Sequence, residues 1–305
     1  MRKLLFVALA LAGALASIGV APAAAQQTFA TPQEAAQALV DDATRHDTPA
    51  LLKLFGPSGK SFLDTGNPDE DKRMHDAFVA RAKVKMQVEM EPGNPDWAKV
   101  VVGDNDWPFP IPLMRNKEGQ WHFDSARGQM EITARRIGRN ELTAIDVCRG
   151  YVEAQMEYAA HDHDGDGNLE YAQRIVSSPG KKDGLYQEGQ SDNLVPKSFA
   201  DAAAVIQQGA GKMPMPYHGY YFHILKAQGP DAPGGNLDYV VKGEMIGGFA
   251  MVAWPAEYGV TGIKTLLVSH DGKVYEKDLG SMTPTLARTM TRFNPDKTWN
   301  AVEGE

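Results

Sequence analysis

The chain has 305 residues, with 31 basic and 39 acidic side chains and a single cysteine. Its formal net charge of −8 at pH 7 argues against nucleic acid or an anionic membrane surface as a partner, and it favours cation binding. One cysteine excludes an intramolecular disulfide, and the length suffices for two ordinary domains or one large one.

The first 25 residues have the pattern of a secretory signal peptide. Arg2 and Lys3 provide a basic start, Leu4 to Val20 is an uncharged apolar run, and Ala23 to Ala25 provide small residues for cleavage. We expect cleavage near Ala25 and a periplasmic or secreted mature chain. No later stretch approaches the ~20 apolar residues of a membrane span, so no transmembrane segment is expected after cleavage.

Helices open the first half, and strands follow them. Thr31, Pro32 and Glu34 form a capping box that predicts the first helix start. Two more helices are expected over 48–55 and 69–83. Period-two alternation then predicts strands over 84–90, 97–102, 108–112 and 120–124, and Ser125 begins another helix. The prolines of 108–112 favour an edge strand there.

A central helix opens the second half. Arg135 to Arg139 are expected to form a basic turn, and Asn140 is expected to cap a helix that ends near His161. Cys148 lies on the apolar face of this helix and is expected to be buried. The rest is predicted as a short helix over 169–176, a surface loop over 179–197, a helix from 196, and strands over 217–225, 245–254, 263–269 and 273–277. Asp271-Gly272 predicts a tight hairpin turn between the last two strands.

This order of elements indicates an α+β fold with helices packed on antiparallel sheets. We expect two units, residues 26–138 and 139–305. The central helix and the Asp-rich loop that follows it would join them.

The Asp-rich loop is the strongest candidate site. Asp162, Asp164 and Asp166 alternate, and Gly167 follows them, which is the opening of an EF-hand-type calcium loop. In that numbering the candidate metal ligands are Asp162, Asp164, Asp166, Asn168, Glu170 and Gln173. A bidentate Glu is usual where Gln173 stands, so any calcium affinity should be weak. Calcium is the cofactor that this loop favours.

Two other interpretations of this loop remain open. The run could be a solvated turn in which Asn168 caps a following helix and Glu170 lies in its first turn. His161 and His163 flank the loop and could serve a transition metal, although no cysteine or third histidine is near them in sequence.

The aromatic stretch 217–225 is the second candidate site. His218, Tyr221 and His223 could carry acid–base chemistry or bind a polar ligand. The alternative is ordinary sheet packing with satisfied hydroxyl groups. No Gly-x-Ser-x-Gly, His-Glu-x-x-His, Walker or dinucleotide-binding pattern is present.

Several longer stretches resemble segments of one family. They are Asp-Trp-Pro-Phe-Pro-Ile-Pro at 106–112, Gly-Arg-Asn-Glu-Leu at 138–142, the run 162–171, Pro-Gly-Lys-Lys-Asp-Gly-Leu-Tyr at 179–186, Tyr-His-Gly-Tyr-Tyr-Phe at 217–222, Ala-Gln-Gly-Pro at 227–230, the segment 247–259 and Tyr-Glu-Lys-Asp-Leu-Gly at 275–280. Together they are similar to the bacterial domain-of-unknown-function family 2950 over nearly all of the mature chain. The resemblance implies an exported bacterial protein whose halves form one family unit, and it implies no catalytic residues.

We therefore expect a non-enzymatic module of the bacterial envelope with a candidate calcium loop. Its partner would be another envelope protein or a small ligand. The alternative is a periplasmic hydrolase-like enzyme that uses His218 and neighbouring tyrosines.

Overall fold

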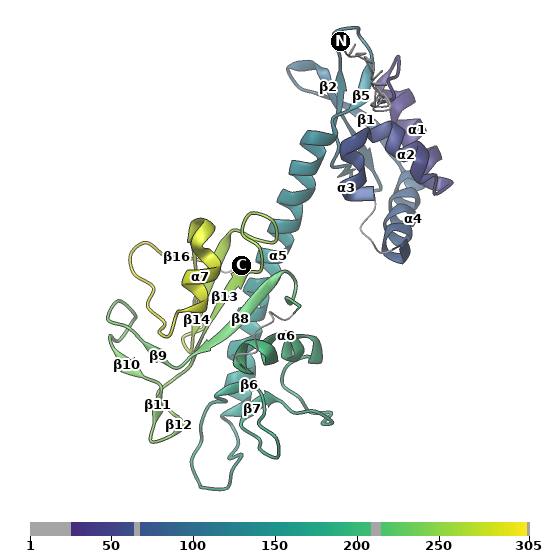
Figure 1. Ribbon diagram of the computed structural model, residues 1–305. Coiled ribbons are helices and arrows are strands. Elements are labelled where there is room, and N and C mark those ends of the chain that lie inside the picture. Colours follow the sequence, from purple (N-terminus) through teal and green to yellow (C-terminus); the bar gives the residue numbers. More distant parts are fainter. Residues whose placement is uncertain (1–25, 64–67, 209–214, 304–305) are drawn as a thin grey trace, which may run out of the picture. The chain divides into compact units, whose positions relative to one another are not determined.

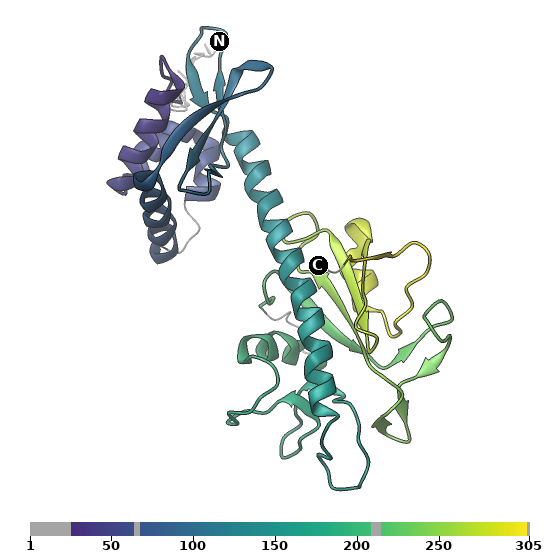
Figure 2. The ribbon, with the colours of Figure 1, turned by 180° about the vertical axis from the view of Figure 1, so that it is seen from behind.

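The computed structural model describes residues 26–63, 68–208 and 215–303, so the expected signal peptide lies outside the described residues. The chain divides into two compact units, one up to Gln129 and one from Met130. The division falls inside the long helix α5 (Ser125–Tyr158), N-terminal to the boundary expected from the sequence. Figures 1 and 2 show the elements of each unit.

Unit 1 packs helices against one antiparallel sheet (Figure 1). Its helices are α1 (Pro32–Thr44), α2 (Thr48–Phe55), α3 (Lys60–Leu63) and α4 (Pro68–Val84). Its strands are β1 (Met86–Glu91), β2 (Asn94–Val102), β3 (Trp107–Pro108), β4 (Leu113–Arg115) and β5 (Trp121–Phe123). The strand order is β1-β2-β4-β5, and β3 pairs with β2.

The start of α1 follows the predicted capping box. The Thr31 hydroxyl accepts the Glu34 N–H at 3.2 Å, and the Glu34 carboxylate accepts the Ala30 N–H at 3.1 Å. The prediction for 108–112 was only partly right, because the paired strand β3 ends at Pro108. Pro110 and Pro112 have no N–H to donate to a ladder.

Unit 2 is built on the second part of α5 and an antiparallel sheet. The sheet has the order β16-β15-β14-β13-β8. Its strands are β8 (Tyr220–Leu225), β13 (Ala250–Pro255), β14 (Lys264–Ser269), β15 (Val274–Asp278) and β16 (Asn300–Ala301). The helices α6 (Lys197–Gln208) and α7 (Thr283–Arg288) pack against β8 and β13, respectively.

Three small strand pairs complete unit 2. They are the parallel pair β6 (Arg174–Val176) and β7 (Gly184–Tyr186), and the antiparallel pairs β9 (Ala227–Gln228) with β10 (Leu237–Asp238) and β11 (Val240–Val241) with β12 (Glu244–Met245). The observed helices and antiparallel sheets confirm the α+β class.

The apolar stripe of α5 faces the core of unit 2. Cys148 and Tyr151 are 0% and 1% exposed, and the Tyr151 ring lies 5.5 Å from the Phe249 ring. Burial raises the pKa of the Cys148 thiol to about 12, which makes it an inert core side chain, as predicted.

The helix break expected at 135–140 does not occur, and α5 is continuous through it. Arg136 Nε donates to the Val260 carbonyl at 3.1 Å, and Asn140 Nδ2 donates to the Thr261 carbonyl at 2.8 Å. The Asn140 side chain therefore bonds to a loop that is distant in sequence, and it does not act as a helix cap.

The predicted helix over 169–176 is also wrong. The side-chain amide of Gln155, which is 0% exposed, accepts the Ala172 N–H at 2.9 Å and donates to the Ala172 carbonyl at 2.8 Å. These bonds take both backbone groups that a helix would need, and the chain continues as β6.

The hairpin predicted at Asp271-Gly272 is present between β14 and β15, but its turn type differs. Gly272 has a φ of 75°, whereas Asp271 does not have a positive φ. The Gly272 N–H donates to the Ser269 carbonyl at 2.9 Å, so a single left-handed residue closes the turn.

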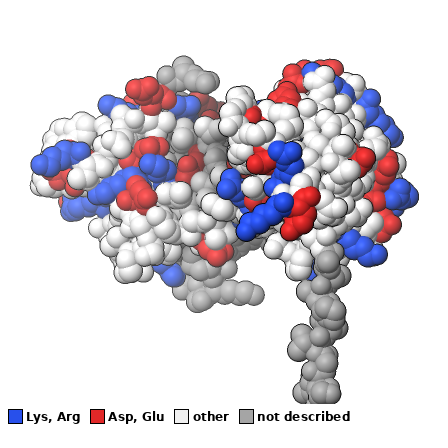
Figure 3. Space-filling model, turned by 90° about the horizontal axis from the view of Figure 1, so that it is seen from above, with Lys and Arg blue, Asp and Glu red and all other residues white. Residues whose placement is uncertain are grey.

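Charged side chains of both signs are mixed on the face shown in Figure 3. The ion pairs of unit 1 include Lys85–Asp106 at 2.6 Å. Among the described residues, every helix is too short or too polar to span a membrane.

The continuity of α5 predicts that Gly138→Ala stabilises the protein. No neighbouring atom lies within 4 Å of the position of an added Cβ, and alanine has the higher helix propensity. We expect a gain of about 0.5–1 kcal/mol in the free energy of unfolding, measured by denaturant titration.

Gly262→Ala is the control, because its Cβ would clash with the hydroxyl oxygen of buried Tyr220. This variant should lose stability by about 1–3 kcal/mol. A loss of stability in Gly138→Ala would contradict a continuous helix at this position.

Candidate functional site

The Asp-rich loop begins where α5 ends. The His163 ring stacks on the Tyr158 ring at 3.8 Å with an interplanar angle of 17°. His163 Nε2 lies 2.9 Å from the Tyr158 carbonyl oxygen, and the Tyr158 hydroxyl donates to the Lys182 carbonyl at 2.5 Å. The His163 ring and the last turn of α5 therefore hold the start of the loop.

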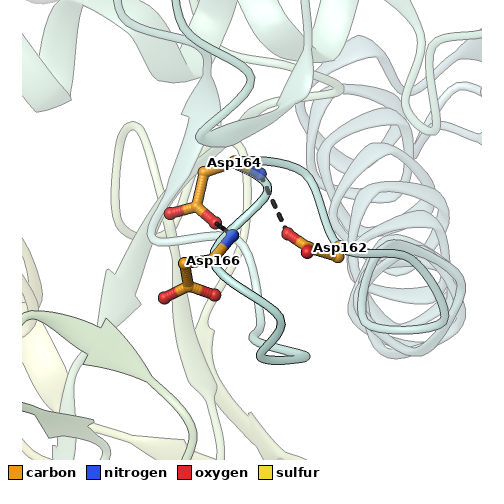
Figure 4. A group of neighbouring side chains, drawn as sticks. All are labelled: Asp162, Asp164 and Asp166. Carbon is orange, nitrogen blue, oxygen red and sulfur yellow. Dashed lines mark hydrogen bonds between the residues drawn. The ribbon is translucent and has the colours of Figure 1, made fainter.

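Three carboxylates converge in this loop. One oxygen from each of Asp162, Asp164 and Asp166 lies within 4.8 Å of the others, and all three residues are exposed. Figure 4 shows the three side chains and the two hydrogen bonds that link them through the backbone. Like charges at this separation repel one another.

Asp162 organises the loop. Its carboxylate accepts the N–H groups of Asp164 at 3.2 Å, Gly165 at 2.7 Å and Gly167 at 2.9 Å. These bonds hold the pKa of Asp162 below its usual range, with the bonds from Gly165 and Gly167 contributing most. Gly165 and Gly167 have φ values of 84° and 88°, which glycine adopts without strain.

Asp164 and Asp166 continue the same pattern. Asp164 Oδ1 accepts the Asp166 N–H at 3.2 Å. Asp166 Oδ1 accepts the Asn168 N–H at 2.8 Å, and Asp166 Oδ2 accepts from the Asn168 side chain at 3.1 Å. Asn168 therefore supports Asp166 through its backbone and side-chain N–H groups, and its backbone carbonyl is the candidate metal ligand at this position.

Glu170 and Gln173 contact the β11–β12 hairpin. Glu170 Oε2 accepts the Met245 N–H at 3.3 Å. Gln173 Nε2 donates to the Gly243 carbonyl at 2.5 Å, and its Oε1 accepts from Lys226 at 3.2 Å. The structure thus brings three of the six predicted ligand side chains together, while two others hold the hairpin beside the loop.

The carboxylates around the loop influence one another. Burial raises the pKa of Glu170, and the charges of Asp164, Glu244 and Asp166 raise it further, against the lowering effect of the Met245 N–H. Within the described residues, neither these four carboxylates nor Asp162 forms an ion pair with a basic side chain. Among the described residues, no ion pair therefore compensates the negative charge of these carboxylates.

The sequence did not reveal Glu244 as part of this surface. The stretch from Met245 to Trp254 was expected to be one strand, but it separates into β12 and β13. The sequence signal that could have revealed this hairpin was Lys242-Gly243. These two residues have φ values of 53° and 100° and form the tight turn between β11 and β12.

His218 lies in an exposed turn. Its φ is 48° and that of Gly219 is 78°, and the N–H and carbonyl groups of Tyr217 and Tyr220 bond each other at 3.0 Å. These features define a two-residue turn that needs positive φ at both positions. The local backbone geometry explains the pair His218-Gly219 without a catalytic role.

Tyr221 and His223 lie on β8 and share one face of that strand. Tyr221 is 8% exposed, and its ring lies 5.9 Å from the ring of Trp254. Burial lowers the pKa of half-buried His223, and the charge of Lys226 lowers it further. In the part of the chain that the structure describes, neither His218 nor His223 pairs with a carboxylate.

The fold and the site define an α+β protein of two compact units with an exposed Asp-rich loop. The sequence model of the family described as "Protein of unknown function (DUF2950)" matches residues 26–302, and the chain belongs to this family. The match includes both units and confirms the resemblance seen in the motifs. No curated protein and no solved structure matches the chain.

The environment of Glu170 predicts that Glu170→Gln stabilises the metal-free protein at neutral pH. A raised pKa means that the folded state binds the proton more tightly than the unfolded state, so ionised Glu170 opposes folding. The neutral amide removes this cost and can still accept the Met245 N–H.

The stability of the wild type should therefore fall, relative to that of the variant, as the pH rises from the unfolded pKa near 4.5 through the raised folded pKa. Thermal unfolding in EDTA at several pH values measures this difference. If the variant is more stable than the wild type by the same amount at about pH 4 and about pH 7, the electrostatic explanation is contradicted.

Proposed function

We propose that the protein is a non-enzymatic module of the bacterial envelope whose Asp-rich loop binds calcium. The observation that carries the proposal is the convergence of Asp162, Asp164 and Asp166 within 4.8 Å, with no basic partner among the described residues. A divalent cation would relieve the repulsion between these carboxylates.

The chemistry of the loop favours calcium over softer metals. Calcium takes oxygen ligands in flexible geometry, and the loop offers carboxylates at positions one, three and five with glycine at position six. The Asn168 carbonyl is at position seven, and Glu170 at position nine could act through a bound water. Gln173 is engaged by Gly243 and Lys226, so we expect weak affinity, with Kd ~10⁻⁴–10⁻³ M.

The transition-metal interpretation of His161 and His163 has less support. Their ring centroids are 6.4 Å apart, and His163 Nε2 already faces the Tyr158 carbonyl. A soft metal would have to displace this contact and find further ligands among carboxylates.

The enzyme alternative has a weaker structural basis than the binding module. His218 is explained by its turn, and no carboxylate orients either His218 or His223 within the described residues. If a hydrolase activity were detected, an unchanged rate in His218→Ala would contradict the role assigned to this histidine.

Export is supported by the basic start, the apolar run Leu4 to Val20 and the small residues before Gln26. We expect the protein from a bacterial host to be found in the periplasm or the medium, with an N-terminus near Gln26. Intact-mass measurement of a fractionated sample tests this. Cytoplasmic protein that retains residues 1–25 would contradict it.

The calcium proposal predicts a metal-dependent rise in the midpoint of thermal unfolding. At a calcium concentration about tenfold above Kd, binding should stabilise residues 26–305 by about 1.4 kcal/mol relative to EDTA. The variant Asp164→Asn/Asp166→Asn should lose most of this gain.

Asp104→Asn/Asp192→Asn is the matched control, because both residues are exposed aspartates outside the loop. It removes the same charge and should retain the calcium response of the wild type. An equal response in the loop variant and the wild type would contradict binding at this site.

A further inference from the structure

A pocket of about 450 Å³ lies beside the Asp-rich loop in unit 2. It is lined by Asn168, Leu169, Val241, Lys242, Glu244 and Ile246. Asn168 also bonds Asp166, so the pocket and the carboxylate cluster are parts of one surface. The volume lies within the range of known ligand sites.

Aliphatic side chains are unusually exposed in this pocket. Leu169, Val241 and Ile246 are 58%, 41% and 48% exposed. Three large apolar groups that meet at one surface point to a binding site, because an occupant that covers them removes apolar area from water.

Carboxylates border the side of the pocket that adjoins the Asp-rich loop. Glu244 lines the pocket, and its charge raises the pKa of Glu170, as do those of Asp164 and Asp166. Lys242 is the single basic residue among those that line the pocket. An occupant must therefore combine an apolar group with positive charge.

We propose that this surface binds a segment of a partner protein in which an aliphatic side chain is flanked by lysine or arginine. The aliphatic group would enter the pocket between Leu169, Val241 and Ile246. The flanking cations would pair with the carboxylates of the loop and with Glu244, which have no basic partner among the described residues.

Charge disfavours two other occupants of this surface, an anionic membrane and a second copy of the chain. An anionic membrane surface would be repelled by the carboxylates beside the pocket. A second copy of the chain, docked through the same surface about a two-fold axis, would bring the two sets of carboxylates close to each other. A cationic and aliphatic peptide satisfies both the charge and the apolar requirement.

The inference adds a partner class to the proposed envelope module and does not require calcium. Calcium and a cationic segment would compete for the same carboxylates. The binding experiment is therefore done in EDTA, where failure of the calcium proposal does not affect its outcome.

The probe is a fluorescein-labelled hexapeptide, Lys-Lys-Leu-Ile-Lys-Lys, and binding to residues 26–305 is measured by fluorescence anisotropy. Lys-Lys-Ser-Ser-Lys-Lys lacks the aliphatic groups, and Glu-Glu-Leu-Ile-Glu-Glu reverses the charge. We expect each control peptide to bind at least about tenfold more weakly than the probe.

Two variants test the two halves of the surface. Leu169→Ser/Ile246→Ser removes exposed apolar groups, and Asp164→Asn/Asp166→Asn removes charge. Each should weaken probe binding about tenfold. Leu237→Ser is the control, since Leu237 is 43% exposed but lies outside the pocket, and it should bind the probe as the wild type does.

Equal binding of the probe and the serine peptide would overturn the proposal, because charge alone would then explain the affinity. Unchanged probe affinity in Leu169→Ser/Ile246→Ser would overturn it as well. The same holds if this variant abolishes a dimer seen by sedimentation, or abolishes binding to phosphatidylserine vesicles in EDTA, because the surface would then serve a second copy or a membrane.

Discussion

The buried side-chain amide of Gln155 fixes the path of the chain around the candidate site. Its bonds to both backbone groups of Ala172, at 2.9 and 2.8 Å, join the end of α5 to the start of β6. Gln155 is 0% exposed, so an unpaired amide there would cost about 1–3 kcal/mol. The intervening residues must therefore form a closed loop on the surface, and this loop contains the three aspartates.

The loop concentrates negative charge that the described residues do not neutralise. Asp162 is held by three backbone N–H groups, so it cannot turn away without breaking the loop. Glu170 is bonded to Met245 and contributes to the same charged surface, together with Glu244 of the hairpin. Both proposals follow from this one physical feature, since either a divalent cation or a cationic partner segment reduces the repulsion.

The sequence predicted best those features that depend on neighbouring residues. The capping box at Thr31, the hairpin at Asp271-Gly272 and the clustering of alternating aspartates each involve groups a few positions apart. The errors arose where distant residues decide the structure. Asn140 is bonded to Thr261, and Ala172 to Gln155, so neither follows its local preference. The Met245 N–H that bonds the Glu170 side chain is about 75 positions away in the sequence. The spacing of residues within the loop could therefore not reveal that the β11–β12 hairpin lies beside it.

Backbone NMR during a calcium titration shows whether the carboxylates organised by Asp162 bind a cation. The amides of Gly165 and Gly167 donate to Asp162, so their resonances report on that carboxylate. If calcium binds there, we expect saturable shifts of these two amides, with smaller shifts in the β11–β12 hairpin. Unchanged glycine amides at millimolar calcium, or shifts no larger than those beside exposed Asp104 and Asp192, would contradict cation binding by these carboxylates.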